Sequence, residues 1–258
     1  MSSGKFDQLL ASAAKAGDSP KMRDLLARGA DPRSRGSFAL SEAASYGHVE
    51  CVRLLLPVSD PKACDSHALR MAAQNGHPEC VALLIPASDA KEGNSYALRW
   101  AARYGHEECV RLLLPASDAK ANESEALWWA AESGRVECVK LLLAASDPAA
   151  MDSQALRWAA RQGHEECVRM LLAVSGPIGK IGGLLEKVFE SGHARVAALM
   201  IEAEPRLLDE ICLPKCLAEA FENCHGDLAS YLSAIIDEKE LSSIAQNWPD
   251  RKLGAARL

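Results

Sequence analysis

Residues 95–117 read Ser-Tyr-Ala-Leu-Arg-Trp-Ala-Ala-Arg-Tyr-Gly-His-Glu-Glu-Cys-Val-Arg-Leu-Leu-Leu-Pro-Ala-Ser, and this stretch decides the fold. Four near-copies of it begin at serines placed at multiples of 29 residues from Ser95: Ser37, Ser66, Ser124 and Ser153. Glycine recurs at the same interval from Gly47 to Gly192. A fixed period of this length is typical of proteins that stack one small structural unit many times.

Each copy predicts two helices joined by a tight turn. Ser66 is a candidate N-cap for the first helix of its copy. Leu69, Ala72 and Ala73 follow at spacings that place them on one helical face. Gly76 favours an end to this helix, because glycine readily adopts the left-handed conformation found at helix C-termini. A second apolar stripe follows, so the unit is a helix–turn–helix.

The order Ala-Leu-x-x-Ala-Ala-x-x-Gly-His-x-Glu-x-Val-x-x-Leu-Leu resembles the ankyrin repeat, and the resemblance covers roughly residues 5–204. An ankyrin repeat has about 33 residues, so each copy here is shorter, and most of the missing residues come from the β-hairpin finger. The resemblance implies a stack of helix pairs that binds proteins. We therefore expect an all-α, ankyrin-like helical-repeat solenoid of about seven to eight helix pairs, with little or no β-structure.

The chain divides into three predicted parts of one continuous solenoid domain. Residues 1–34 are predicted to be an N-terminal capping ankyrin-like repeat, and residues 35–175 hold the five near-identical repeats. Residues 176–258 are predicted to form degenerate repeats and a C-terminal helical cap, with a last helix that ends near Asn247. The outer parts differ from the repeats because the terminal units of a stack expose a face to water.

Charge and hydropathy exclude two classes of partner. The formal net charge of -6 argues against nucleic acid, since phosphate contacts need an excess of Lys and Arg. No stretch reaches the ~18 apolar residues of a membrane-spanning helix, and the N-terminus lacks the apolar segment of a signal peptide. These features predict a cytoplasmic monomer, or a protein that is delivered into a host cell.

Cysteine and histidine recur at fixed places in the repeat, which favours a structural role over catalysis. The cysteine column is expected to be buried and reduced, because neighbouring stacked helices lie too far apart for disulfides. The histidine column is expected to bridge the turn of one unit to the next. The two columns are Cys51, Cys80, Cys109, Cys138, Cys167 and His48, His77, His106, His164, His193. We therefore predict no catalytic residue and no cofactor.

One unrepeated cluster has some resemblance to a metal site: Cys212, Cys216, Cys224 and His225. Structural zinc prefers paired ligands separated by two to five residues. Cys224 and His225 are adjacent, and adjacent helical residues point in different directions. We therefore favour ordinary core and turn residues over a zinc site and predict no metal ligand.

Positions that vary between copies are candidates for partner binding, because stacking leaves them free to change. The first helices of ankyrin-like stacks line the concave face that solenoids use for binding. Arg, Tyr and Trp are common on this predicted face and are enriched in interface hot spots; the alternative is a solvated, variable surface. The predicted partner-binding residues are His67, Arg70, Tyr96, Arg99, Arg103, Tyr104, Glu125, Trp128, Glu132, Arg157 and Arg161.

Three tryptophans occupy one repeated place and are expected to pack between neighbouring units: Trp100, Trp129 and Trp158. Trp128 stands in a column that otherwise holds mostly arginine, so it is the strongest single hot-spot candidate. The tandem Trp128-Trp129 is expected to place one ring outward and one between repeats.

These observations predict a non-enzymatic protein–protein interaction module that binds a folded partner on its concave first-helix face. The arginines favour a partner with acidic patches. Near-identical repeats are common in bacterial and viral host-targeting proteins, which makes such a role a further hypothesis. The alternative is an adaptor whose C-terminal segment, residues 205–258, recruits separate machinery such as a ubiquitin-ligase subunit. An enzyme built on that segment is disfavoured, because so short a segment cannot form a core and a pocket.

Overall fold

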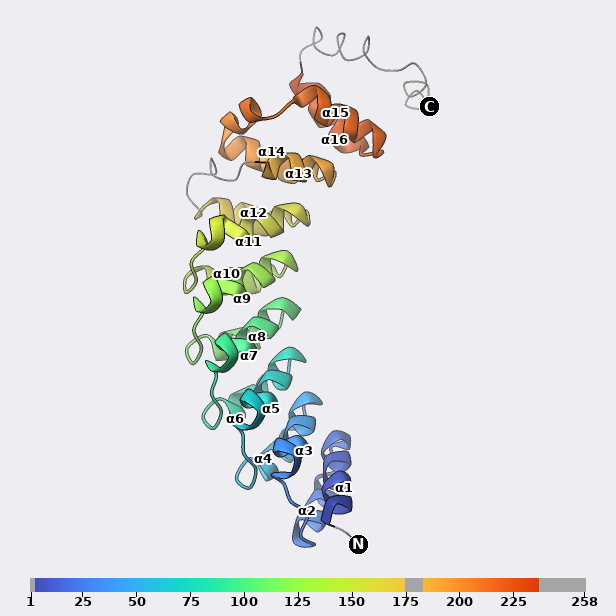
Figure 1. Ribbon diagram of the computed structural model, residues 1–258, viewed down its shortest axis with the longest axis vertical. Helices are drawn as coiled ribbons and strands as arrows, with labels where there is room; N and C mark the ends of the chain where they lie inside the picture. The colour runs from blue at the N-terminus through green and yellow to red at the C-terminus, as the bar shows by residue number, and fades with distance from the viewer. Residues whose placement is uncertain (1–2, 175–182, 237–258) are drawn as a thin grey trace. The chain divides into compact units, whose positions relative to one another are not determined.

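The computed structural model describes residues 3–174 and 183–236, in which the regular elements are all helical (Figure 1). Sixteen α-helices form eight successive pairs, with one short 3-10 helix, and the described residues contain no strand. The predicted all-α fold, the number of helix pairs and the replacement of the β-hairpin fingers are therefore confirmed for this part of the chain. The predicted helix end near Asn247 lies outside the described residues.

The chain forms two compact units, residues 1–150 and residues 151–258, and each is described by itself. The helices of the first unit are α1 (Ser3–Ala16), α2 (Ser19–Ala27), α3 (Ser34–Ser45), α4 (Val49–Leu55), α5 (Ala63–Gln74), α6 (Pro78–Leu84), α7 (Glu92–Tyr104), α8 (Glu107–Leu113), α9 (Ala121–Glu132) and α10 (Val136–Leu143). Those of the second unit are α11 (Ala150–Arg161, which begins on the last residue of the first unit), α12 (Glu165–Leu172), α13 (Leu184–Glu190), α14 (Ala194–Ala203), the 3-10 helix η2 (Pro205–Glu210), α15 (Leu213–Glu222) and α16 (Gly226–Ile235).

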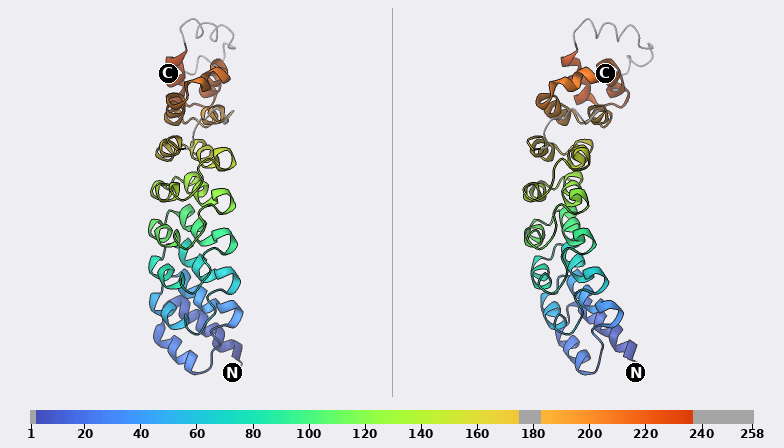
Figure 2. Two further views of the ribbon diagram at one scale, coloured as in Figure 1. Left: turned by 90° about the vertical axis from the view of Figure 1, so that its left-hand side faces the viewer. Right: turned by 60° about the vertical axis from the view of Figure 1, so that its left-hand side comes forward.

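The first unit has two layers of helices. The first helices of the pairs (α1, α3, α5, α7 and α9) contact one another in sequence order, and so do the second helices α2, α4, α6, α8 and α10 (Figures 1 and 2). The core lies between the layers and consists of the repeated apolar positions. Leu98 and Ala101 of α7, for example, are fully buried together with Val110 and Leu113 of α8. Burial of the same positions in every copy explains why these residues hardly vary.

A left-handed turn replaces the finger in each near-identical repeat. Residues 64–66 have φ of 51°, 57° and 53°, although only glycine adopts this region without cost. The turn is held by the segment between α6 and α7, because the backbone N–H of Asp89 donates to Oγ of Ser66 at 2.9 Å. Equivalent bonds reach Ser37, Ser95 and Ser124. The serine column therefore ties the start of each first helix to the segment that leads into the next repeat, a role that the N-cap interpretation missed.

The turn between the two helices of a pair also carries a contact between repeats. Gly76 has φ of 73° and ends α5 as predicted. The ring of His106 lies against Gly76, and its Nε2 donates to the carbonyl of Gln74 at 2.9 Å. His48 and His77 make the same bond to the preceding repeat. The predicted bridging role of the histidine column is confirmed at these positions.

Candidate partner-binding face

The predicted binding residues lie on the first helices of four repeats. Nine of the eleven belong to α5, α7 and α9 of the first unit, and Arg157 and Arg161 belong to α11 of the second unit. We use the name first-helix face for the surface side chains of α5, α7 and α9. Within the second unit, Arg157 donates to the carbonyl of Asp152 at 2.9 Å and Arg161 lies 5.1 Å from the ring of Trp158. A role in partner binding stays a prediction for all eleven residues.

Two of the nine residues on the first-helix face are buried against each other. Arg99 of α7 forms an ion pair with Glu125 of α9, and only 8% and 9% of their side chains are exposed. Arg99 also donates to the carbonyl of Gly93 at 2.6 Å, while Asn122 donates to the same carboxylate oxygen of Glu125 at 2.5 Å. This pair joins two neighbouring repeats. It therefore belongs to the packing of α7 on α9 more than to the surface.

Guanidinium groups and aromatic rings alternate across these helices. The guanidinium carbon of Arg99 lies 4.1 Å from the ring centroid of Tyr96 and 5.7 Å from that of Trp129. The same two rings are approached by other arginines. The guanidinium carbon of Arg70 lies 5.4 Å from the ring centroid of Tyr96, and that of Arg103 lies 4.8 Å from the ring centroid of Trp129. Such distances allow cation–π attraction. We call this set the Arg/aromatic cluster; its members are Arg70, Tyr96, Arg99, Trp100, Arg103, Tyr104 and Trp129.

The tryptophans of the cluster pack between repeats, as their column predicted. The rings of Trp100 and Trp129 meet edge to face at 5.2 Å, and Tyr104 stacks on Trp100 at 5.6 Å. Trp128 meets Trp129 edge to face at 5.6 Å, and both rings are half-buried. The expected division into one outward ring and one packed ring therefore holds only in part. Consecutive helical residues differ by about 100°, so both rings reach the edge of the interface between repeats.

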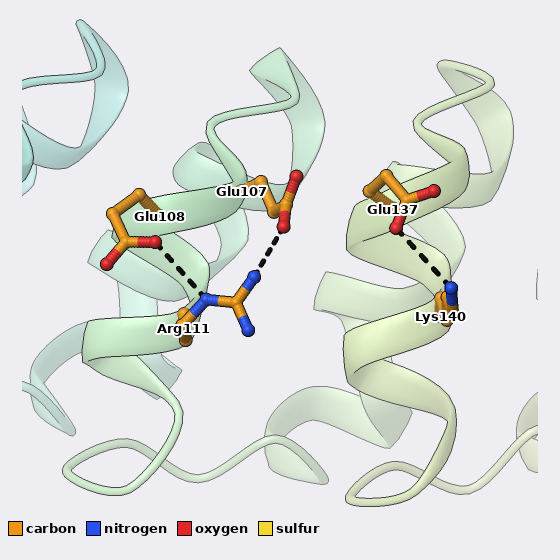
Figure 3. A network of polar contacts seen from close by, with 5 residues as sticks. All are labelled: Glu107, Glu108, Arg111, Glu137 and Lys140. Atoms are coloured by element: carbon orange, nitrogen blue, oxygen red, sulfur yellow. Dashed lines mark hydrogen bonds and ion pairs between the residues drawn. The ribbon is translucent and has the colours of Figure 1, made fainter.

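Charges are paired on the second helices of the same repeats (Figure 3). Arg111 of α8 contacts Glu107 at 2.5 Å and Glu108 at 3.2 Å, and Lys140 of α10 lies 3.8 Å from Glu137. Each pair lies within one helical turn and is exposed, so each contributes little to stability. These ion pairs nevertheless affect the charge of the surface, because each of these cations is neutralised by carboxylates of its own helix.

The half-buried arginines of the first-helix face differ in this respect. No carboxylate within the described ranges forms an ion pair with Arg70 or Arg103, whose guanidinium groups lie over rings instead. Arg135 adds a further cation next to Arg103, because it replaces the histidine of its column and donates from Nε to the carbonyl of Arg103 at 3.3 Å. Arg135 was not among the predicted binding residues. Its departure from an otherwise regular histidine column is the sequence signal that could have identified it.

The repeated cysteines are buried thiols. Burial raises the pKa of Cys80, Cys109 and Cys138 to about 11, and all are free of disulfides. Within residues 3–174 and 183–236, no three His, Cys, Asp or Glu side chains are grouped as metal ligands. The helices of those ranges include none that is long and apolar enough to cross a membrane.

The comparisons with known proteins agree with this architecture. A family model described as ankyrin repeats in three copies matches residues 10–94, 58–123 and 98–179. These matches together span residues 10–179 and hence more than half of the chain. A search of curated proteins found no match to the sequence.

Proposed function

The chain belongs to the ankyrin-repeat family, whose members serve as protein–protein interaction modules, and we propose that it binds a folded partner through its first-helix face. One contrast carries the proposal. Leu69, Leu98 and Leu127 are identical and fully buried. Six residues later in each repeat, the side chain is not buried and varies from Asn75 to Tyr104 to Ser133. Stacking thus explains what is constant, whereas the variable positions lie where a partner can reach them.

The residue types of this face support the same proposal. Tyr104 is 42% exposed, and Arg103 and Trp128 are half-buried beside it or in the next repeat. Partly exposed Tyr, Trp and Arg side chains contribute most of the binding energy in many interfaces. Helices hold them in place before binding, so little conformational entropy is lost on association. The family is typically non-enzymatic, and we propose that this chain acts through binding alone.

The finer aspects of the proposal concern the partner and its setting. The arginines of the face favour a partner with acidic patches. The near-identity of the five repeats favours recent duplication, as in bacterial and viral proteins that act on a host, and we extend the proposal to such a role.

Affinity capture with the full chain, followed by titration of purified candidates, tests the proposed function. Tyr104→Ala combined with Trp128→Ala should weaken binding of a confirmed partner at least tenfold, by roughly 1.4 kcal/mol or more. Val58→Ala is a matched control, because Val58 is an apolar side chain with 41% exposure that lies in the turn after α4 and not on α5, α7 or α9. Equal affinity of wild type and the double variant would reject the first-helix face as the interface.

The alternative is an adaptor that recruits other machinery through residues 205–258. A specific observation favours testing it: Phe221 of α15 is 50% exposed, in a segment that departs from the repeat consensus. Phe221→Ser in the full chain should leave the captured proteins unchanged if the first-helix face alone binds partners. Loss of a distinct set of captured proteins in this variant would favour the adaptor.

A further inference from the structure

We infer that the Arg/aromatic cluster binds a partner segment rich in Asp and Glu, whose carboxylates pair with the guanidinium groups of Arg70 and Arg103. The inference rests on the proposed function, because it takes the first-helix face as the interface. It goes further in specifying a segment rich in Asp and Glu as the ligand and in naming the two residues that recognise it.

The pairing of Arg99 with Glu125 provides the template. The guanidinium of Arg99 lies over the rings of Tyr96 and Trp129, and its charge is neutralised by Glu125, whose carboxylate accepts a hydrogen bond from a terminal guanidinium nitrogen. A guanidinium presents its N–H donors in its own plane, so stacking on a ring leaves the donors free for a carboxylate. Within the cluster, the charge of one arginine is therefore neutralised, although its buried Nε makes no hydrogen bond to the described residues.

Arg70 and Arg103 also have their guanidinium groups over aromatic rings, as Arg99 does. Arg70 uses the same Tyr96 ring as Arg99, at 5.4 Å, and Arg103 uses the same Trp129 ring, at 4.8 Å. Both side chains are half-buried, and neither has an ion-pair partner among the carboxylates that the structure describes. The exposed Arg111 of α8 is arranged otherwise, since it is paired with two glutamates of its own helix. Arg70 and Arg103 thus lack the carboxylate that Arg99 has.

The surroundings of the two arginines make a carboxylate the fitting ligand. Aromatic carbon on one side of each guanidinium excludes water, and charge-assisted hydrogen bonds are stronger where water is excluded. Arg135, exposed and without a described ion-pair partner, adds positive charge beside Arg103. The whole chain nevertheless carries a net charge of -6, which repels long polyanions such as nucleic acids. A protein segment with a few Asp or Glu residues matches this local and limited positive charge.

A peptide selection tests the inference without knowledge of the natural partner. A display library of random 16-residue peptides is selected against the full chain, and the enriched peptides are titrated by fluorescence polarisation. We expect enrichment of Asp and Glu. We also expect at least a tenfold loss of affinity in the variant Arg70→Gln/Arg103→Gln, as removal of charge-assisted hydrogen bonds predicts.

The control removes the same charge from the other face. Arg53→Gln/Lys140→Gln changes two exposed cations of α4 and α10, so its net charge equals that of the test variant. Its affinity for the peptides should stay within about twofold of wild type, and melting temperatures should show that both variants fold. The inference is overturned if the selection shows no acidic enrichment, or if the test and control variants bind equally well.

The experiment separates failure of the inference from failure of the proposed function. A captured partner that needs Tyr104 and Trp128 but binds the Arg70→Gln/Arg103→Gln variant as tightly as wild type would overturn the inference and leave the function intact. Acidic peptides that depend on Arg70 and Arg103, together with no captured protein partner, would support the recognition chemistry and reject the function.

Discussion

Three arginines of the first-helix face have different environments at the residue scale. The buried Arg99 is neutralised by Glu125, whereas the side chains of Arg70 and Arg103 are only half-buried. The buried pair joins α7 to α9, so a substitution at Arg99 tests folding before it tests binding. Reversal of the charge at Arg99 would place two carboxylates together in the interior, and it is therefore unsuitable as a test of the interface.

Two variants test the contribution of the buried pair to stability. Glu125→Ala leaves a buried guanidinium without its carboxylate and should lower the free energy of unfolding by about 3 to 5 kcal/mol. Replacement of both partners, as Arg99→Met/Glu125→Leu, should recover most of this loss because no charge remains buried. Urea denaturation followed by circular dichroism gives both values. A single variant as stable as wild type would mean that the pair contributes nothing to stacking.

The buried thiols predict a loss of stability in alkali. An unfolded cysteine ionises near its ordinary pKa of 9, whereas burial raises the pKa of Cys80 and Cys109 to about 11. The folded state therefore holds these protons longer, so their contribution is complete below pH 9 and is lost as the pH rises from 9 to 11. The melting temperature should fall more steeply over this range in wild type than in Cys80→Ala/Cys109→Ala. Parallel pH profiles would contradict this expectation.

At the scale of elements, the turn that contains the glycine and the histidine is the repeated contact between neighbouring repeats. A Cβ on Gly47 would lie 2.5 Å from Nδ1 of His77, and φ at this glycine is 73°. Glycine is thus required twice, for the left-handed backbone and for the close approach of the histidine ring. Gly29 separates the two requirements, because its φ is 86° but nothing lies within 4 Å of a Cβ built there.

Alanine substitutions at these two glycines separate the cost of backbone strain from the cost of losing the contact with the histidine ring. Gly29→Ala should cost about 1 to 2 kcal/mol of unfolding free energy, the cost of a left-handed alanine. Gly47→Ala should cost roughly 1 to 2 kcal/mol more, because it also displaces the His77 ring, whose Nε2 bonds the carbonyl of Ser45. Chemical denaturation of both variants gives the comparison. Equal losses would show that the histidine contact is dispensable.

Contacts between successive helix pairs set the expected unfolding behaviour of the first unit as a whole. Successive first helices contact one another from α1 to α9, so each of α3, α5 and α7 contacts the first helices before and after it. In such an array, stability is approximately a sum over units and their nearest-neighbour interfaces. A defect in a central unit therefore weakens two interfaces, whereas a defect in the terminal unit weakens one.

Two fully buried leucines provide the test. Leu98→Ala in α7 and Leu10→Ala in α1 each remove a core side chain and should cost about 2 to 5 kcal/mol locally. Leu10→Ala should release the first helix pair alone, while Leu98→Ala should destabilise helices on both sides of it. Hydrogen exchange read by mass spectrometry resolves the difference. Identical exchange patterns in the two variants would show that the unit unfolds as one block.

The architecture could be predicted from the sequence because stacking imposes the same contacts at every repeat. The constant positions, such as Leu98 and Val110, are fully buried as the 29-residue pattern required, and glycine ends the first helices. The short segment that replaces the finger could be located but not described. Its left-handed conformation, seen at residues 64–66, occurs with a hydrogen bond from Asp89, which lies 23 residues after Ser66 in the segment before α7.

The sequence by itself therefore determined the period, the helix pair, the buried positions and the face on which variation is allowed. Only the tertiary structure decided which variable residues are available to a partner. Arg99 and Arg70 occupy the same column, yet only Arg99 is neutralised, because Glu125 lies 26 residues further along the chain and packs against it from the next repeat. The physical reason is that burial at a repeated position depends on the side chain that faces it across the stack, and a local pattern does not contain that neighbour.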